Sequence, residues 1–198
     1  MPPSPKTIGI LAFQGDVIEH AAILKKLQCQ VIEVRTIKDL STCDALIIPG
    51  GESTTIGLFL EQTGLNKKII QHAANGMPIL GTCAGAIMLA KNIESNIIPS
   101  HLGLLDITIQ RNAYGHQIDS FHADIQIPSL NIKNLKAAFI RAPLIKKTGP
   151  KVKILARHDG TNNTNEIILV QQGKILAATF HPELLGDHRL HQYFLSLI

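Results

Sequence analysis

The segment MPILGTCAGAIMLA, residues 77–90, sets the architecture of the chain. An apolar run ends at Gly81 and resumes after Gly85, which predicts a strand, a tight turn and a helix, with Cys83 in the turn. The two glycines suit a sharp turn that pushes Cys83 out of the sheet, as in a nucleophile elbow. Unpaired backbone N–H groups at the helix start would favour its thiolate. Taken alone, the pattern fits a buried structural cysteine equally well.

Before this segment, apolar strands alternate with helices. Strands are predicted over residues 7–13, 30–35 and 45–48, and helices over 17–28, 53–61 and 65–75. Asp16, with Glu19 three residues later, is typical of an N-cap with a capping box. This alternation predicts an α/β fold in which helices cover both faces of a mostly parallel sheet.

The second half of the chain contains shorter strands and a final helix. The strands are predicted over residues 106–111, 117–127, 137–141, 152–158, 166–171 and 175–180, and the helix over 184–197. We expect an antiparallel or mixed portion of the sheet here. Because no linker, repeat or low-complexity segment interrupts the chain, we predict one domain over residues 1–198.

Composition excludes several classes of protein. The 198 residues are 45% hydrophobic and 17% charged, which is typical of a globular chain with one core. Three cysteines without a C-x-x-C pair argue against a disulfide framework or a zinc site and favour a reducing cytoplasm. The N-terminus lacks the apolar core of a signal peptide, and no apolar run approaches the roughly 18 residues of a membrane helix. We therefore expect a soluble cytoplasmic protein.

The net charge of +4 raises the possibility of nucleic-acid binding, because several lysines lie between residues 133 and 153. Aromatic residues make up only 4% of the chain, too few for stacking on single-stranded bases. We expect no nucleic-acid partner and interpret the lysines as a solvated face or a docking face for an acidic protein.

Three further clusters could carry chemistry. In Pro49-Gly50-Gly51-Glu52-Ser53 the glycines would let backbone N–H groups approach an oxyanion, although a plain turn with Ser53 as N-cap is the alternative. The absence of a G-K-[ST] ending excludes a P-loop.

In Phe180-His181-Pro182-Glu183, the histidine could take a proton from a thiol while the carboxylate orients its ring. A surface histidine beside an acid in the last helix would look the same. Arg111 and Arg141 end two predicted strands and suit a bidentate carboxylate contact, or else structural ion pairs.

Together these motifs resemble those of the class I, triad-type glutamine amidotransferases: P-G-G-E-S-T-T, G-T-C-A-G and F-H-P-E occur in that order. The strings AFQGDVIEH (12–20), GLLDITIQRNAYG (103–115), DSF (119–121) and FIRAP (139–143) are similar to the glutaminase subunit of pyridoxal 5′-phosphate synthase. The similarity runs from about residue 7 to the C-terminus. The sequence departs from the family pattern at three positions: Tyr114 stands where Phe is expected, His116 where Arg is expected, and His122 where an acidic residue is expected. These departures affect the expected surface and docking details.

The resemblance implies a flavodoxin-like, three-layer α/β/α fold. It implies that Cys83 attacks the glutamine side-chain amide, that His181 acts as base and then acid, and that Glu183 orients His181. Backbone N–H groups of Gly51 and Ala84 would form the oxyanion hole. The glutamine site would be lined by Gly51, Glu52, Ser53, Arg111, Ile140 and Arg141. Neither a metal nor a cofactor is implied for this chain.

The resemblance also implies a partner. The ammonia would pass to a synthase subunit that makes pyridoxal 5′-phosphate, in vitamin B6 biosynthesis, from ribose 5-phosphate and glyceraldehyde 3-phosphate. Glutaminase activity would depend on that partner, because the peptide between Gly50 and Gly51 can turn over at little steric cost and Gln14 could hold its active orientation. Two alternatives stay open: a glutaminase subunit of another biosynthetic pathway, and a non-catalytic regulatory partner of a synthase.

Overall fold

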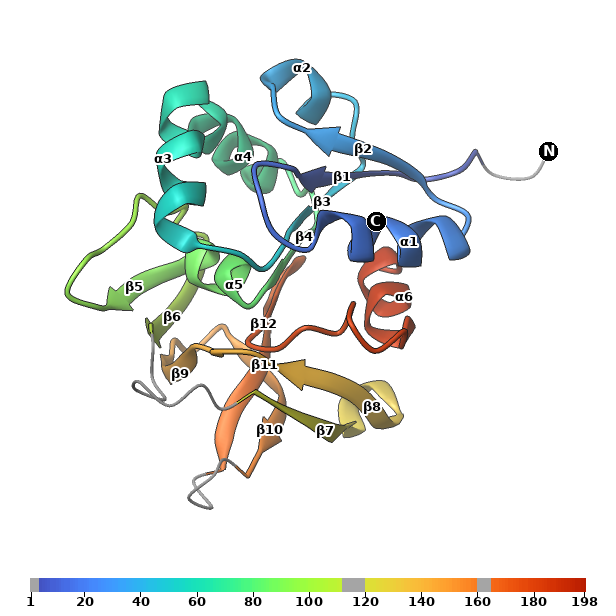
Figure 1. Cartoon of the computed structure of the whole chain (residues 1–198), viewed down its shortest axis with the longest axis vertical. Helices are drawn as coiled ribbons and strands as arrows, with labels where there is room; N and C mark the ends of the chain where they lie inside the picture. The colour runs from blue at the N-terminus through green and yellow to red at the C-terminus, as the bar shows by residue number, and fades with distance from the viewer. Residues whose placement is uncertain (1–3, 112–119, 160–164) are drawn as a thin grey trace.

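Short apolar runs rich in β-branched residues form a central ten-stranded sheet, seen in a computed structural model that describes residues 4–111, 120–159 and 165–198 (Figure 1). Five strands run parallel in the order β2-β1-β3-β4-β12. They are β1 (Thr7–Leu11), β2 (Gln30–Val34), β3 (Ala45–Ile48), β4 (Ile79–Thr82) and β12 (Ile175–Ala178). The predicted parallel core is confirmed.

Beyond β12 the sheet becomes mixed, as the shorter C-terminal strands predict. The order continues through β11 (Glu166–Gln172), β9 (Leu144–Thr148), β6 (Leu105–Gln110) and β5 (Ala90–Glu94), while β10 (Lys153–His158) pairs with β11. Pairs β12/β11, β11/β9 and β9/β6 are antiparallel, and β6/β5 is parallel. Separately, β7 (Phe121–Ile127) and β8 (Ile132–Phe139) form a two-stranded sheet, joined by a 3-10 turn over Pro128–Leu130.

Helices cover both faces of the sheet because the parallel strands are apolar on both sides. In β3, Leu46 and Ile48 pack into one buried cluster, whereas Ala45 and Ile47 pack into the other. The first cluster is covered by α2 (Ile37–Leu40), α3 (Ser53–Thr63), α4 (Leu65–Ala74) and α5 (Ala84–Leu89). The second is covered by α1 (Val17–Lys26), α6 (Arg189–Leu195) and the β7-β8 sheet (Figure 1). None of the described helices has the length and apolar character needed to span a membrane.

Some predicted elements need correction. The first strand ends at Leu11 rather than residue 13, and the last helix is only Arg189–Leu195 rather than 184–197. The sequence did not predict α2, β5 or β9. The helix after Cys83 stops at Leu89 because Ala90 starts β5, a change from helix to strand inside one apolar run that periodicity cannot detect. Residues 117–119 of one predicted strand lie outside the described residues.

Candidate active site

The predicted elbow is present between β4 and α5. Cys83 has a φ of 49°, a conformation that a non-glycine residue rarely adopts and that marks strained functional turns. Gly85 makes the turn possible, because a Cβ there would lie 1.9 Å from the carbonyl oxygen of Ile48. Cys83 is only 8% exposed, so it is buried, but it lines a cavity. Its Sγ lies 3.8 Å from the carbonyl oxygen of Ile140.

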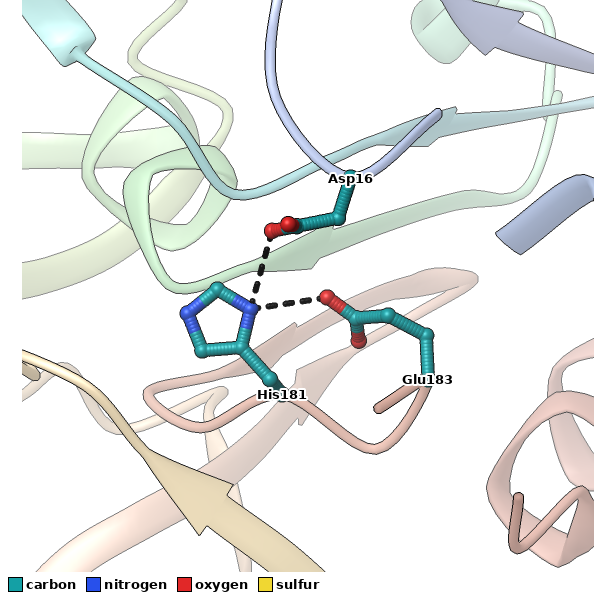
Figure 2. Close-up of side chains that lie close together, drawn as sticks. All are labelled: Asp16, His181 and Glu183. Atoms are coloured by element: carbon teal, nitrogen blue, oxygen red, sulfur yellow. Dashed lines mark hydrogen bonds and ion pairs between the residues drawn. The ribbon is translucent and has the colours of Figure 1, made fainter. Parts of the chain in front are cut away.

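His181 lies just beyond the end of β12. Its backbone pairs with Ala138 of β8 through two hydrogen bonds, of 2.8 and 3.3 Å, which tie the histidine to the smaller sheet. Nδ1 of His181 lies 2.8 Å from Oε1 of the fully buried Glu183 (Figure 2). With Nδ1 committed to a carboxylate, Nε2 is the ring nitrogen left for Cys83 and a substrate.

Charge around His181 favours the imidazolium. Burial alone would lower the pKa of His181, but hydrogen bonds with Asp16, Cys83 and Glu183 outweigh it and raise the pKa to about 12. Burial also raises the pKa of Glu183. A protonated ring beside Cys83 stabilises a thiolate, so the site can hold a thiolate and an imidazolium together.

Asp16 was predicted as a helix cap with a capping box, and the structure corrects this. Its backbone occupies the N-cap position of α1, but its side chain makes no capping hydrogen bond. Oδ2 of Asp16 instead lies 3.1 Å from Nδ1 of His181 (Figure 2). A second carboxylate therefore lies at His181, a contact that sequence reasoning missed.

Most of the predicted site residues line one cavity of about 370 Å³, a volume suited to a small ligand. Its lining includes Gln14, Gly51, Glu52, Ser53, Cys83, Ala84, Arg111, Ile140, Arg141 and His181, together with Gly15, Asp16, Ile87 and Pro143, which were not predicted as site residues. Gly50 and Glu183, both buried, are not among its lining residues. The structure thus brings together residues from six separate segments of the sequence.

The start of α3 forms one wall of the cavity. Glu52, not Ser53, is the N-cap, and its carboxylate accepts hydrogen bonds from the N–H groups of Thr54 and Thr55. Partial burial would raise the pKa of Glu52, but these hydrogen bonds lower it to about 2. Ser53 begins the helix and is 3% exposed. The predicted alternative in which Ser53 is the N-cap is therefore wrong in its cap residue.

The two arginines approach the cavity differently. Arg111 contacts Oε1 of Glu52 at 3.3 Å and donates to the carbonyl oxygen of Ile97 at 2.8 Å, so it is both a lining residue and a structural ion pair. Arg141 is exposed, has a φ of 45° and lines the same cavity. Arg141 is therefore the guanidinium more available to a ligand.

The β1-α1 turn packs against the two glycines after β3. Nε2 of Gln14 donates to the carbonyl oxygen of Glu52 at 2.9 Å. The Gly50 carbonyl oxygen lies against Gly15, where an added Cβ would be only 1.7 Å away. Gly51 has a φ of 151°. Gln14 thus lies at the expected place, beside the Gly50-Gly51 peptide.

A buried chain of polar groups backs Glu183. Nε2 of His20 lies 3.1 Å from Oγ1 of Thr82 and 3.5 Å from Oε1 of Glu183, and Nδ1 of His20 lies 2.9 Å from Nε2 of His191. Burial lowers the pKa of both histidines, so both are neutral. We assign Nε2–H of His20 towards the carboxylate and Nε2–H of His191 towards His20, which leaves the unpartnered Nδ1 of His191 as a bare acceptor.

Ligand atoms of Asp16, His181 and Glu183 lie within 4.8 Å of one another, a spacing that could in principle hold a metal ion. A proton on Nδ1 of His181 can be shared between one oxygen of each carboxylate, at 2.8 and 3.1 Å, while Oε2 of Glu183 has no hydrogen-bond partner. These contacts are those of an imidazole oriented by carboxylates for acid-base chemistry.

Comparisons with known proteins agree with this geometry. The model of the SNO glutamine amidotransferase family matches residues 10–198. A protein of Thermotoga neapolitana named pyridoxal 5′-phosphate synthase subunit PdxT is 47% identical over 191 residues, covering 96% of this chain and 98% of the relative. One of Herpetosiphon aurantiacus with the same name is 49% identical over 193 residues, covering 96% of this chain and all of the relative.

Solved structures show the same fold. A crystal structure described as a glutamine amidotransferase superposes with a TM-score of 0.88 at 43% identity, covering 96% of this chain and 97% of that one. A chain from the structure of PurLQS from Thermotoga maritima superposes at 0.70 with 16% identity, covering 97% and 98%, and shows the fold alone. The predicted three-layer α/β/α architecture of class I glutamine amidotransferases is confirmed, and the chain belongs to the SNO glutamine amidotransferase family.

Proposed function

We propose that this chain hydrolyses L-glutamine to L-glutamate and ammonia through Cys83, His181 and Glu183, as the glutaminase subunit of a pyridoxal 5′-phosphate synthase. One observation carries the proposal: a cysteine with positive φ and a histidine bonded to a buried carboxylate line the same cavity of about 370 Å³. A structural cysteine needs neither the strained backbone nor the acid-base partner.

The first half of the reaction forms a thioester. The thiolate of Cys83 attacks the carbon of the side-chain amide, and the amide oxygen takes the negative charge. Backbone N–H groups of Gly51 and Ala84, both on the cavity wall, would stabilise that oxygen. As the C–N bond breaks, the imidazolium of His181 gives its Nε2 proton to the leaving nitrogen, and ammonia is released.

The second half regenerates the enzyme. Nε2 of His181, now neutral, takes a proton from water as the water oxygen attacks the γ-glutamyl thioester. The tetrahedral adduct collapses, the C–S bond breaks, and glutamate leaves with Cys83 again a thiolate beside an imidazolium. Glu183 stabilises the charged ring in each half through its 2.8 Å contact with Nδ1.

The cavity also suits the amino-acid end of glutamine. Arg141 offers a guanidinium for the α-carboxylate, and Glu52, whose low pKa keeps it ionised, offers an acceptor for the α-ammonium. Arg111 would hold Glu52 in place through its 3.3 Å contact. Ile140 and Ser53 complete the wall that faces the substrate.

The full-length similarity to relatives named as pyridoxal 5′-phosphate synthase subunits supports the synthase as partner, rather than an enzyme of another pathway. The ammonia would then enter the synthase subunit that builds pyridoxal 5′-phosphate from ribose 5-phosphate and glyceraldehyde 3-phosphate. The intact Cys83, His181 and Glu183 argue against a purely regulatory role.

The test is glutamate release and coenzyme formation in a reconstituted mixture of this chain and a pyridoxal 5′-phosphate synthase subunit. We expect glutamine to support coenzyme formation, and Cys83→Ala to abolish this while added ammonium salt still supports it. Cys29→Ala is the matched control and should stay active. Equal activity of Cys83→Ala and wild type would refute the proposal, and ammonia transfer to the synthase of another pathway but not to this one would refute the pathway.

A further inference from the structure

The β1-α1 turn brings a second carboxylate to the triad. We propose that Asp16 is a positioning residue that shares with Glu183 the task of holding His181 by its Nδ1. The proposal rests on the proposed thiol amidase function for its effect on catalysis, but its structural claim can be tested without glutamine. It adds a fourth side chain to the Cys-His-Glu set.

The contact geometry is that of a clamp with two carboxylates. Oδ2 of Asp16 lies 3.1 Å and Oε1 of Glu183 lies 2.8 Å from the same Nδ1 of His181, and the two acids approach it from different elements (Figure 2). Asp16 comes from the turn that follows β1, and Glu183 from the segment that follows β12. A single Nδ1–H can therefore be shared between two acceptors, which restrains the ring from two sides.

The Asp16 side chain contacts His181 and does not cap helix α1. An aspartate at an N-cap ordinarily accepts a hydrogen bond from a backbone N–H group, and losing that bond destabilises the helix. The side chain of Asp16 makes no such bond in α1. Its carboxylate is turned to His181, 28% exposed and on the cavity wall. Local helix chemistry alone does not explain this orientation.

Gly50 provides the space for the clamp. A Cβ at Gly50 would lie 2.3 Å from Cε1 of His181 and 2.6 Å from Oδ2 of Asp16. The carboxylate and the ring therefore pack directly on the backbone that leads to Gly51. The clamp thus joins the triad to the turn after β3 that would supply the oxyanion-hole donor.

The two carboxylates have different environments. Glu183 is fully buried, and burial raises its pKa, so its negative charge is costly by itself. Asp16 is partly solvated, and its hydrogen bond with His181 lowers its pKa, so it stays ionised. Among the described residues, the charged or titratable groups that act on His181 are Asp16, Glu183 and Cys83, with neutral His20 beside Glu183. Asp16 is therefore the better solvated source of negative charge for the imidazolium.

The direct test follows the protonation of His181 in the full chain labelled with ¹⁵N-histidine, with the signal assigned by His181→Gln. In wild type the ring should show the two N–H signals of an imidazolium at about pH 8, where free imidazole is neutral. Asp16→Asn should lower the apparent pKa of His181 by about one to three units, the effect of removing one nearby opposite charge. Asp16→Ser should give the same shift, and because serine can cap α1 it guards against misfolding.

Glu19→Gln is the matched control, because it removes an acid from the same first turn of α1. It should leave the titration of His181 unchanged. If Asp16→Asn and Asp16→Ser titrate His181 as wild type and Glu19→Gln do, the clamp does not exist. This measurement needs no turnover. A chain that failed to hydrolyse glutamine would therefore refute the proposed function but would not test whether Asp16 holds His181.

A second measurement uses kcat of the synthase-activated chain for Glu183→Gln, Asp16→Asn and the double variant. If the acids share one task, each single variant keeps one carboxylate, and the double variant should lose more than the product of the two single losses. A loss equal to that product would show that the acids act independently. That result would contradict a shared clamp.

Discussion

At the scale of single residues, what separates Cys83 from the other cysteines is its surroundings. Burial raises the pKa of both Cys29 and Cys43, which keeps them as thiols at neutral pH. Cys83 lies beside His181, whose pKa is raised to about 12. We therefore attribute the proposed reactivity of Cys83 to the neighbouring imidazolium and not to exposure, since Cys83 is only 8% exposed.

Arg141 is the residue whose removal should report substrate binding most cleanly. A charge-assisted hydrogen bond is worth about 1.5–3 kcal/mol, so Arg141→Ala should raise the KM for glutamine roughly ten- to a hundredfold. The value of kcat should change little, because the α-carboxylate is held equally in the ground and transition states. Steady-state kinetics of glutamate release in the synthase complex measure both constants.

Arg35→Ala is the control for this prediction, since Arg35 forms an exposed ion pair with Glu33 on β2. It should leave both constants unchanged. If Arg141→Ala lowers kcat at constant KM, Arg141 positions the catalytic groups or the partner instead of the substrate.

At the scale of elements, the turn at Gln14–Asp16 packs against the Gly50-Gly51 peptide. This contact links the β1-α1 connection to the candidate site. Gly15 has a φ of 92°, and a Cβ there would collide with the Gly50 carbonyl oxygen. Gly15→Ala should therefore displace the peptide that leads to the oxyanion hole. Loss of one oxyanion donor costs about a hundredfold to a thousandfold in kcat, and we expect a fall of at least about tenfold.

Gly76→Ala separates this effect from backbone strain. Gly76 has a φ of 91° but nothing within 4 Å of an added Cβ. Each variant should lose about 1–2 kcal/mol of stability through the left-handed backbone. Only Gly15→Ala should also lose kcat. Equal activity of the two variants would mean that the turn does not position the peptide.

His20 and His191 join α1 to α6, and their burial should make the stability of the fold sensitive to acid. Burial lowers the pKa of His191 from 6.5 to about 4, so the unfolded chain binds this proton at a higher pH than the folded chain. The free energy of unfolding should therefore fall as the pH falls from 6.5 to 4, by about 3 kcal/mol from this group. Urea denaturation at several pH values should show a smaller acid-induced loss in His191→Leu than in wild type. Parallel pH dependence in both proteins would contradict this assignment.

The alternating strands and helices were predictable because local periodicity dictates them, as the two-sided burial of β3 shows. Short elements were not. Helix α2 has only four residues, and β5 begins at Ala90, the last residue of the apolar run that forms α5. Their structure comes from tertiary packing, which leaves no periodic signal in so few residues.

At the scale of the whole molecule, the active-site motifs were visible in the sequence because each is a short string at the end of a strand. Asp16 was misinterpreted because an aspartate before a helix is usually a cap, and only the fold brings it to His181. The pairing of His20 with His191 was hidden for the same reason. Side chains that meet across layers carry no local signature.

We expect the glutaminase activity to be controlled by binding of the synthase. An isolated glutaminase subunit would waste glutamine, so we expect the free chain to be slow and the synthase to accelerate it at saturating glutamine. Gln14 donates to the Glu52 carbonyl beside the Gly50-Gly51 peptide, and Gln14→Ala should blunt this acceleration. Glutamate release with and without the synthase measures it. A free chain as fast as the complex would rule out activation by the synthase.

Labelling of the nucleophile tests the central claim most directly. The chain, in complex with its synthase, is treated with a glutamine-analogue electrophile, and the modified peptide is identified by mass spectrometry. Labelling should occur at Cys83, should be slowed by glutamine, and should be lost in His181→Ala, while Cys29 and Cys43 stay unmodified. Modification of Cys29 or Cys43 with Cys83 left free, or labelling that glutamine does not slow, would contradict the assignment of Cys83 as the glutaminase nucleophile.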